Sequence, residues 1–238
     1  MLFILDSTQQ LQYLKDTILN KGIVMVQSFN HFCPVARAME KVGDKWSLLI
    51  IRDLLHGPQR FTDLIGSLNN ITPKWLTRRL RDLEEAGIVQ RETQAGRREV
   101  WYSLTPAGRD LEPVVDALTV WGFRHAMRPP APGEAVNPDL MIRGLTFSLN
   151  KRSRRPAHKT IWNMHFPQAT YTLSCDGDVW SSSQEGSADA DVSVKTTPEE
   201  WATLMTAPRS ERSRLTGNVR IEGKVEEVDE FKKIFGIS

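Results

Sequence analysis

The chain has 238 residues, of which 40% are hydrophobic and 25% are charged, so its composition is that of a globular protein and excludes a disordered tail or a fibrous repeat. No apolar run reaches the length of about 18 residues that a membrane span needs, and the 2 cysteines are too few for a disulfide framework, which indicates a reducing cytoplasm. The net charge of +2 excludes no class of partner, and the length predicts two modest domains or one large one.

Residues 1–24 do not resemble a signal peptide. They lack a basic start, and polar residues interrupt their apolar ones. Met25 is a second plausible start of translation, so residues 1–24 are interpreted as an N-terminal extension or a misassigned start. A first domain is expected over residues 25–128.

Three helices are predicted in the first part of this domain. Apolar residues recur three and four positions apart over 36–55, which is the spacing of one buried helix face. A short helix is expected over 63–68, with Thr62 as its N-cap. The Thr-Pro pair at 72–73 is a strong helix start and predicts a third helix over 73–85.

Two strands and a further helix complete the domain. The runs 88–92 and 99–104 are strand-like, and the short Gly-containing segment between them predicts a β-hairpin. A second Thr-Pro pair begins a helix over about 105–124, which Pro113 is expected to bend. This order predicts a mostly α winged helix-turn-helix fold.

The third helix has an aliphatic face and a cationic face. Three leucines stand at i, i+4 and i+7 on the first: Leu76, Leu80 and Leu83. Three basic residues have the same spacing on the opposite face: Lys74, Arg78 and Arg81. A solvated basic face is the simpler interpretation, but a recognition helix presents such residues to base edges in the major groove.

These patterns together predict a DNA-binding domain. Backbone N–H groups at the helix start can bind phosphate, and arginines of the hairpin can reach a minor groove or phosphates. The candidate DNA-contacting residues lie on the second and third helices and on the hairpin: Thr62, Thr72, Pro73, Lys74, Thr77, Arg78, Arg81, Arg97 and Arg98.

Several motifs of this domain are similar to those of one known family. They include Gly-Asp-Lys-Trp at 43–46, Leu-Thr-Arg-Arg-Leu-Arg at 76–81 and Tyr-Ser-Leu-Thr-Pro-Ala-Gly at 102–108. Over residues 32–124 the chain resembles the HxlR-type winged helix-turn-helix regulators. The resemblance implies a cytoplasmic, nucleoid-associated regulator that binds a palindromic operator as a homodimer and needs no metal, nucleotide or other cofactor.

The last helix of the domain also predicts a homodimer. Its side chains offer more apolar surface than a small domain buries alone. The resemblance implies that this helix and the N-terminal helix form the interface. The expected interface residues of the last helix are Leu111, Val115, Leu118 and Trp121.

Cys33 has two interpretations. It precedes Pro34 at an expected helix start, and Arg37 lies one turn further on, which are conditions that favour a thiolate. Some members of the resembled family sense oxidants or electrophiles through a cysteine in this context, which makes Cys33 a redox candidate. The alternative is an inert, half-buried structural cysteine.

The remaining residues predict an α+β domain. Residues 129–144 are Pro-rich and are interpreted as a linker. Short strands are expected from residue 160, with a hairpin turn at 176–178, and Thr-Pro-Glu-Glu at 197–200 is a capping box that begins a helix. Over 145–238 the order of elements resembles the sterol-carrier-like domain, which implies a sheet and helices around an apolar tunnel.

That resemblance implies a lipid or another apolar small molecule as ligand, and no membrane partner is expected. The residues that could line the tunnel are large apolar side chains: Trp162, Phe166, Tyr171, Leu173, Trp180, Trp201, Leu204 and Met205. For each of them, a place in the ordinary core of a domain of this size is the simpler interpretation. A basic stretch at 151–155 is interpreted as a solvated connector, or as an additional phosphate contact.

No catalytic pattern is found: no nucleophile-base pair, no Gly-rich phosphate loop and no metal-ligand spacing, so neither an enzyme nor a metal site is expected. The leading hypothesis is a dimeric DNA-binding regulator controlled by a hydrophobic molecule bound in 145–238. One alternative is a redox or electrophile sensor that acts through Cys33. The other is a lipid carrier with a DNA-binding-like dimer module.

Overall fold

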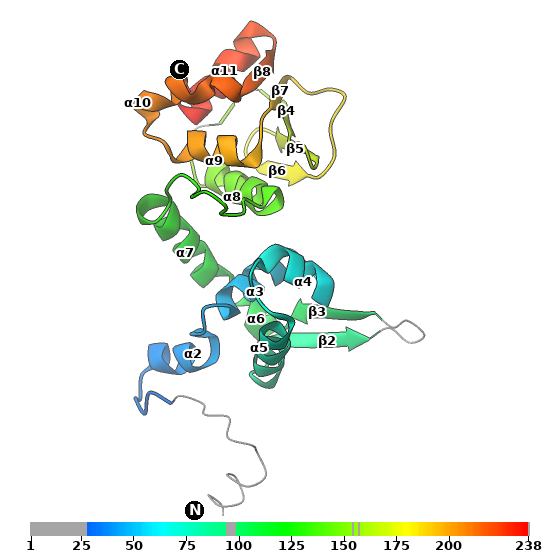
Figure 1. Cartoon of the computed structure of the whole chain (residues 1–238), viewed down its shortest axis with the longest axis vertical. Helices are drawn as coiled ribbons and strands as arrows, with labels where there is room; N and C mark the ends of the chain where they lie inside the picture. The colour runs from blue at the N-terminus through cyan, green and yellow to red at the C-terminus, as the bar shows by residue number, and fades with distance from the viewer. Residues whose placement is uncertain (1–27, 94–98, 154, 157, 238) are drawn as a thin grey trace, which may run out of the picture. The chain divides into compact units, whose positions relative to one another are not determined.

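The computed structural model describes residues 28–93, 99–153, 155–156 and 158–237. It divides the chain into two compact units, residues 1–109 and 110–238. The first unit contains a three-stranded sheet and the second a five-stranded sheet (Figure 1). The predicted extension 1–24 and the hairpin arginines Arg97 and Arg98 lie outside the described residues.

The first unit combines short helices with a small antiparallel sheet. Its elements are α2 (Pro34–Val42), α3 (Ser47–Leu54), β1 (Gln59–Arg60), α4 (Phe61–Leu68), α5 (Pro73–Glu85), β2 (Val89–Thr93), β3 (Val100–Leu104) and α6 (Pro106–Arg109). β3 pairs with β2, which confirms the predicted hairpin, and with β1, a short strand that the sequence pattern does not predict. The core is aliphatic and includes Ile50, Leu64, Leu76, Leu80 and Leu83.

The prediction of a single helix over 36–55 is wrong, because the chain forms two helices, α2 and α3, with a break between them. A Cβ added at Gly43 would lie 2.4 Å from the carbonyl oxygen of Met39. The next residue, Asp44, begins a new turn: its carboxylate accepts from the Trp46 N–H at 2.9 Å, and its carbonyl oxygen accepts from the Ser47 N–H at 3.1 Å. These local bonds compete with continuation of the first helix.

The helix predicted over 105–124 is also interrupted. α6 ends at Arg109, and α7 (Glu112–His125) begins after Leu111. Pro113 lies in the first turn of α7, where the missing N–H of a proline removes no helical hydrogen bond. Pro113 therefore marks the start of a helix instead of bending one.

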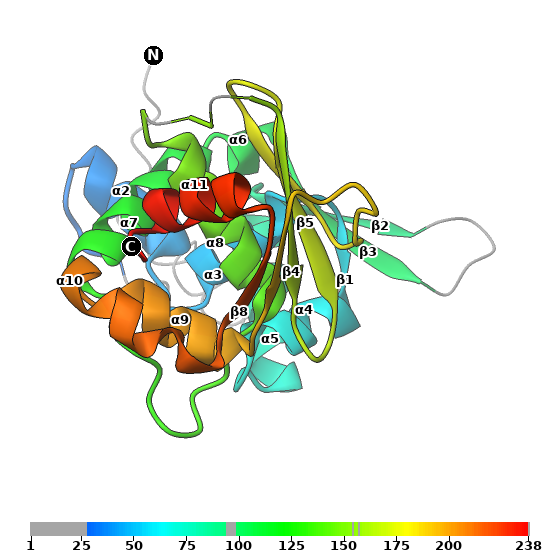
Figure 2. The same cartoon turned by 90° about the horizontal axis from the view of Figure 1, so that it is seen from above.

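The second unit packs helices against a mixed sheet. After α7 its elements are α8 (Pro138–Asn150), β4 (Thr160–His165), β5 (Thr170–Cys175), β6 (Trp180–Ser183), β7 (Val192–Lys195), α9 (Pro198–Thr206), α10 (Arg209–Arg212), the 3-10 helix η1 (Ser213–Asn218), β8 (Arg220–Gly223) and α11 (Val225–Phe235). The strand order is β6-β5-β4-β7-β8, with β4 and β7 parallel and the other pairs antiparallel. Helices α8, α9 and α11 lie on one side of this sheet (Figure 2).

The turn and cap signals of the second half are confirmed. Gly177 has φ 85 in the turn that joins β5 to β6. At the start of α9, Thr197 and Glu200 exchange the two hydrogen bonds of a capping box. Within the described part of the chain, no helix is long and apolar enough to cross a membrane.

Helix α8 begins inside the segment interpreted as a linker over 129–144. The side chain of Asn137 accepts from the Leu140 N–H at 3.2 Å and caps the helix. Ile142 and Leu145 of α8 belong to the hydrophobic core of the second unit. The linker therefore ends earlier than predicted. Pro138, one of the prolines that indicated a linker, occupies the first turn of α8, where a proline is compatible with a helix.

Candidate nucleic-acid interface

Helix α5 is built as the sequence predicts. Thr72 caps it, since its hydroxyl accepts from the Trp75 N–H at 3.3 Å, and Pro73 occupies the first turn. The three leucines of the aliphatic face are buried, whereas Lys74, Arg78 and Arg81 are exposed. One helix therefore carries both the core contact and an open cationic face.

The turn between α4 and α5 is tight. Asn69 and Asn70 both have positive φ, at 37 and 63, a left-handed conformation that asparagine tolerates better than most residues. This turn lets α5 begin only a few residues after α4 ends at Leu68. The pair of helices with the β2–β3 hairpin behind them matches the predicted winged helix-turn-helix order.

Arg78 has an aromatic neighbour that sequence reasoning missed. Trp75 is 49% exposed, and the guanidinium of Arg78 lies 5.5 Å from the centre of its ring. A tryptophan that stands next to the leucine face without joining it is the signal that could have identified this residue. Trp75 and Arg78 therefore place an aromatic ring and a positive charge side by side near the start of α5.

The other arginines of α5 differ in their surroundings. Arg81 pairs with Glu85 at 3.0 Å, and both side chains are largely exposed. Arg79 is mostly buried and pairs with Asp44 at 3.0 Å and with Asp82 at 3.5 Å. Arg79 therefore connects α5 to the α2–α3 junction, and only its neighbours face solvent.

The candidate threonines have internal partners. Thr62 is not the N-cap predicted for α4, because the helix begins at Phe61 and the Asp63 carboxylate accepts from the Arg60 N–H at 3.0 Å. The Thr62 hydroxyl donates to Asp63 at 3.4 Å, and that of Thr77 donates to the Pro73 carbonyl oxygen at 2.8 Å. Both threonines are exposed, so these bonds leave them accessible to a ligand.

Asp63 pairs with Arg60, which in turn contacts the hairpin strand β3. Partial burial raises the pKa of the Asp63 carboxyl, but hydrogen bonds from the Arg60 backbone and guanidinium outweigh it, and the pKa lies below its usual range. Arg60 also approaches Glu99 at 3.6 Å and the ring of Trp101 at 5.6 Å. These contacts join the start of α4 to β3.

Cys33 immediately precedes α2 and is partly exposed. Its carbonyl oxygen accepts from the Arg37 N–H at 3.0 Å, whereas the Arg37 guanidinium pairs with Glu40 at 3.2 Å. The second cysteine, Cys175, is buried in the core of the second unit, and burial raises the pKa of its thiol. Of the two, only Cys33 is accessible to a reagent.

The predicted ligand residues lie in the core of the second unit. Seven are buried and Met205 is partly buried against them. Trp162 packs against Trp180 with ring centres 4.6 Å apart and against Phe231 at 4.8 Å. The indole N–H groups of Trp162 and Trp180 are buried and have no hydrogen-bond acceptor among the described residues.

The basic stretch at 151–155 is anchored to the fold rather than solvated throughout. Arg152 donates to the Ile234 carbonyl oxygen at 2.9 Å, and Arg155 donates to that of Asp178 at 2.6 Å. Lys151 pairs with Asp116 at 3.4 Å. Of these three residues, only Lys151 lies mostly in solvent.

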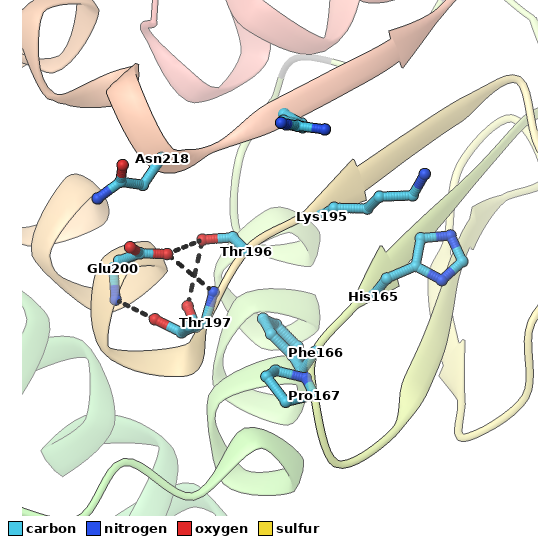
Figure 3. A pocket seen from close by; sticks show the side chains of 9 residues that line it. His165, Phe166, Pro167, Lys195, Thr196, Thr197, Glu200 and Asn218 are labelled. Carbon is cyan, nitrogen blue, oxygen red and sulfur yellow. Dashed lines mark hydrogen bonds between the residues drawn. The ribbon is translucent and has the colours of Figure 1, made fainter.

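Two other features of the second unit could hold a ligand or an ion. An open pocket of about 480 Å³ lies where β4 and β7 end (Figure 3). Separately, His158, Glu227 and Glu230 place one potential metal-ligand atom each within 4.8 Å of one another. His158 Nε2 already lies within hydrogen-bond distance of a Glu227 oxygen, at 3.0 Å, so these two residues have a partner without a metal.

Comparison with known proteins shows which family the first part of the chain, including α7, resembles. Residues 41–129 match the HxlR-like helix-turn-helix family. An HTH-type transcriptional regulator of Mycobacterium tuberculosis is 41% identical over 134 residues, which cover 51% of this chain and 83% of that protein. The HTH-type transcriptional regulator YtcD of Bacillus subtilis is 38% identical over 95 residues, which cover 40% of this chain and 75% of that protein.

Among solved structures, the redox regulator HypR in its oxidized form is 36% identical, with a TM-score of 0.39, and the match covers 40% of this chain and 100% of that one. The family match ends at residue 129, so it covers α2 from Lys41 onward, the helix-turn-helix, the hairpin and α7. Through these residues the chain belongs to the HxlR-like family of helix-turn-helix transcriptional regulators.

Proposed function

We propose that the protein regulates transcription by inserting α5 into the major groove of operator DNA. The observation that carries this proposal is the division of α5 into a buried leucine face and an exposed face with Lys74, Arg78 and Arg81. Arginine reads guanine through two hydrogen bonds, and the capped start of the helix directs N–H groups toward phosphate. Trp75 adds an exposed ring beside Arg78.

Binding to the upstream region of the protein's own gene tests this proposal. Replacement of Arg78 by Ala should weaken binding by about 5- to 150-fold, the equivalent of about 1–3 kcal/mol for a base contact. Arg109→Ala is the matched control, because Arg109 is exposed at the end of α6. Equal affinity and equal sequence preference in wild type and Arg78→Ala would refute the assignment.

Salt dependence separates DNA recognition from the lipid-carrier alternative. A regulator that neutralises several phosphates loses affinity steeply as salt rises, with a log–log slope of about −0.9 for each contact. The predicted phosphate contacts of Arg97 and Arg98 should each contribute about one unit of that slope. Absence of salt-dependent binding to any duplex would favour the carrier.

The same proposal includes a homodimer formed through α7 and α2. Helix α7 has no buried residue, and the exposed fractions of Val114, Leu118, Trp121 and Phe123 lie between 45% and 58%. Of the other expected interface residues, Leu111 and Val115 are half-buried. An apolar helix face of this kind is stabilised by the same face of a second copy, which fits two half-sites of a palindromic operator.

The proposal also includes control of DNA binding by a hydrophobic ligand in the second unit. It is supported by the aromatic core and by the two buried indole N–H groups without an acceptor, since an unpaired buried donor costs about 1–3 kcal/mol that a ligand oxygen could offset. Delipidated protein, titrated with fatty acids or sterols with and without operator, tests it. Operator affinity that is identical with and without a bound ligand would exclude ligand control.

Redox sensing through Cys33 is the competing mode of control. It is supported by the partial exposure of Cys33 directly before a helix of nine residues. Treatment with a thiol oxidant should then change operator affinity in wild type but not in Cys33→Ser. Loss of affinity in both would assign the effect to another residue.

A further inference from the structure

Three basic residues form a row across adjacent strands of the second unit. His165 is opposite Lys195 in the parallel β4–β7 pair, and Lys195 is opposite Arg220 in the antiparallel β7–β8 pair. Their neighbours Met164 and Val194 are buried in the core, so the row lies on the other face of the sheet. The register therefore brings together three residues that are 30 and 25 positions apart in sequence.

This row lines the open pocket of about 480 Å³ at the end of β4 and β7 (Figure 3). The lining contains one acidic side chain, Glu200, among the described residues. Its carboxylate accepts from the Thr197 N–H at 3.1 Å and lies 3.3 Å from the Thr196 hydroxyl, as the dashed lines in Figure 3 show. Glu200 is therefore engaged in capping α9 rather than in neutralising the row.

The charges of the row are only partly compensated. Lys195 pairs with Glu222 at 3.3 Å, but both side chains are more than half exposed, and such a pair contributes about 0–1 kcal/mol. Arg220 has no ion pair within the described residues. Like charges directly opposite each other on neighbouring strands are destabilising, so Lys195 and Arg220 carry a cost that an anion between them would relieve.

The surroundings of the row fit the polar and apolar parts of a small molecule. His165 Nδ1 lies 3.0 Å from the Thr170 hydroxyl, which orients the ring and leaves Nε2 for another partner. Pro167, which is exposed, supplies an apolar wall. The pocket lies at the carboxyl ends of two parallel strands.

We propose that this pocket binds the carboxylate or phosphate group of a small molecule. Arg220 and Lys195 supply the charge, His165 supplies a hydrogen bond from Nε2, and the apolar part of the molecule lies over Pro167. The proposal concerns a binding site in the second unit and does not depend on DNA recognition by α5. Its failure is therefore distinguishable from failure of the proposed function.

Binding measurements on the full chain without DNA test the proposal. The probes are inorganic phosphate, octyl phosphate, octanoate and the uncharged octanol, titrated by calorimetry. The anionic probes should bind wild type, and Arg220→Gln should weaken them at least about tenfold, as expected for a hydrogen-bonded charge. Arg214→Gln is the matched control, because Arg214 is exposed in η1 of the same unit.

The probes also distinguish the sources of the anion. Octyl phosphate or octanoate binding more tightly than inorganic phosphate would support an amphiphile headgroup, and equal affinities would support a free anion. Octanol binding as tightly as octanoate would overturn the proposal, because the charge would then contribute nothing. Equal anion affinity in wild type and Arg220→Gln would overturn it as well.

Thermal unfolding adds a readout that does not need a ligand. Without anions, the double variant with Lys195→Gln and Arg220→Gln should melt at the same temperature as wild type or higher, because cross-strand repulsion is removed. Octyl phosphate should raise the melting temperature of wild type but not that of the double variant. A double variant that melts well below wild type without anions would show that these side chains are structural.

Discussion

At the scale of single residues, Gly108 shows how close two backbones come in the first unit. A Cβ added at Gly108 would lie 2.2 Å from the carbonyl oxygen of Ile88, which is backbone and cannot move aside cheaply. Gly108→Ala should therefore destabilise the protein by about 1–3 kcal/mol in chemical denaturation, the cost of overpacking. The glycine is needed because α6 begins directly against the start of the hairpin.

Gly66→Ala is the control for that experiment. Gly66 is exposed within α4, and nothing lies within 4 Å of the Cβ position. Alanine there should stabilise the helix by about 0.5–1 kcal/mol. If both variants changed stability in the same direction, the close approach at Gly108 would not be the cause.

The contribution of Asp63 to the stability of the folded state should depend on pH. Because the hydrogen bonds from Arg60 lower its pKa, this carboxylate stabilises the folded state above the unfolded pKa of about 3.9, and the contribution is lost as pH falls through the lower folded value. Asp63→Asn should therefore lower the melting temperature at pH 7, and the difference from wild type should shrink toward pH 3. Asp110→Asn, at an exposed position, should show no such convergence.

At the scale of elements, α5 divides its arginines between stability and recognition. Arg79 connects the helix to Asp44, so Arg79→Ala should lower the free energy of unfolding by about 1–3 kcal/mol. Arg81 pairs with Glu85 in solvent, so Arg81→Ala should change stability by no more than about 0.5 kcal/mol.

The two substitutions should affect DNA affinity in the opposite order to their effects on stability. At a temperature where both variants are folded, Arg81→Ala should bind operator more weakly than Arg79→Ala. Circular dichroism and fluorescence anisotropy on the same samples measure both quantities. Weaker operator binding by Arg79→Ala than by Arg81→Ala would mean that the two faces of α5 have been assigned in reverse.

At the scale of the whole molecule, assembly and operator binding should depend on the apolar face of α7. Leu118→Glu places a charge on a side chain that is now 48% exposed, so it should be tolerated by the monomer but not by an interface that buries it. Sedimentation at micromolar concentration should show a dimer for wild type and a monomer for the variant, with operator affinity reduced in parallel.

Ser210→Glu is the control for the added charge, since Ser210 is exposed in α10. It should leave both the sedimentation coefficient and operator affinity unchanged. A wild-type monomer that binds operator normally would contradict the dimer, and the exposed face of α7 would then need another partner.

The sequence by itself determined the features that depend on residues three or four positions apart. Thr72 and Pro73 start α5, and the capping box of Thr197 and Glu200 starts α9, because each hydrogen bond joins a cap to its own first turn. The two faces of α5 follow from helical periodicity alone, which is why the buried leucines and the exposed cations were predicted correctly. The family motifs lie in these same local segments.

Only the tertiary structure decided which distant residues meet. The break between α2 and α3 includes an Asp44 carboxylate whose partner Arg79 lies on α5, and no local pattern reveals such a pair. The row of His165, Lys195 and Arg220 exists only because three strands pair in one register, and sheet register is set by the buried faces of all the strands together. Local hydrogen bonds can be inferred from spacing, whereas contacts between distant segments require the packed core that holds them together.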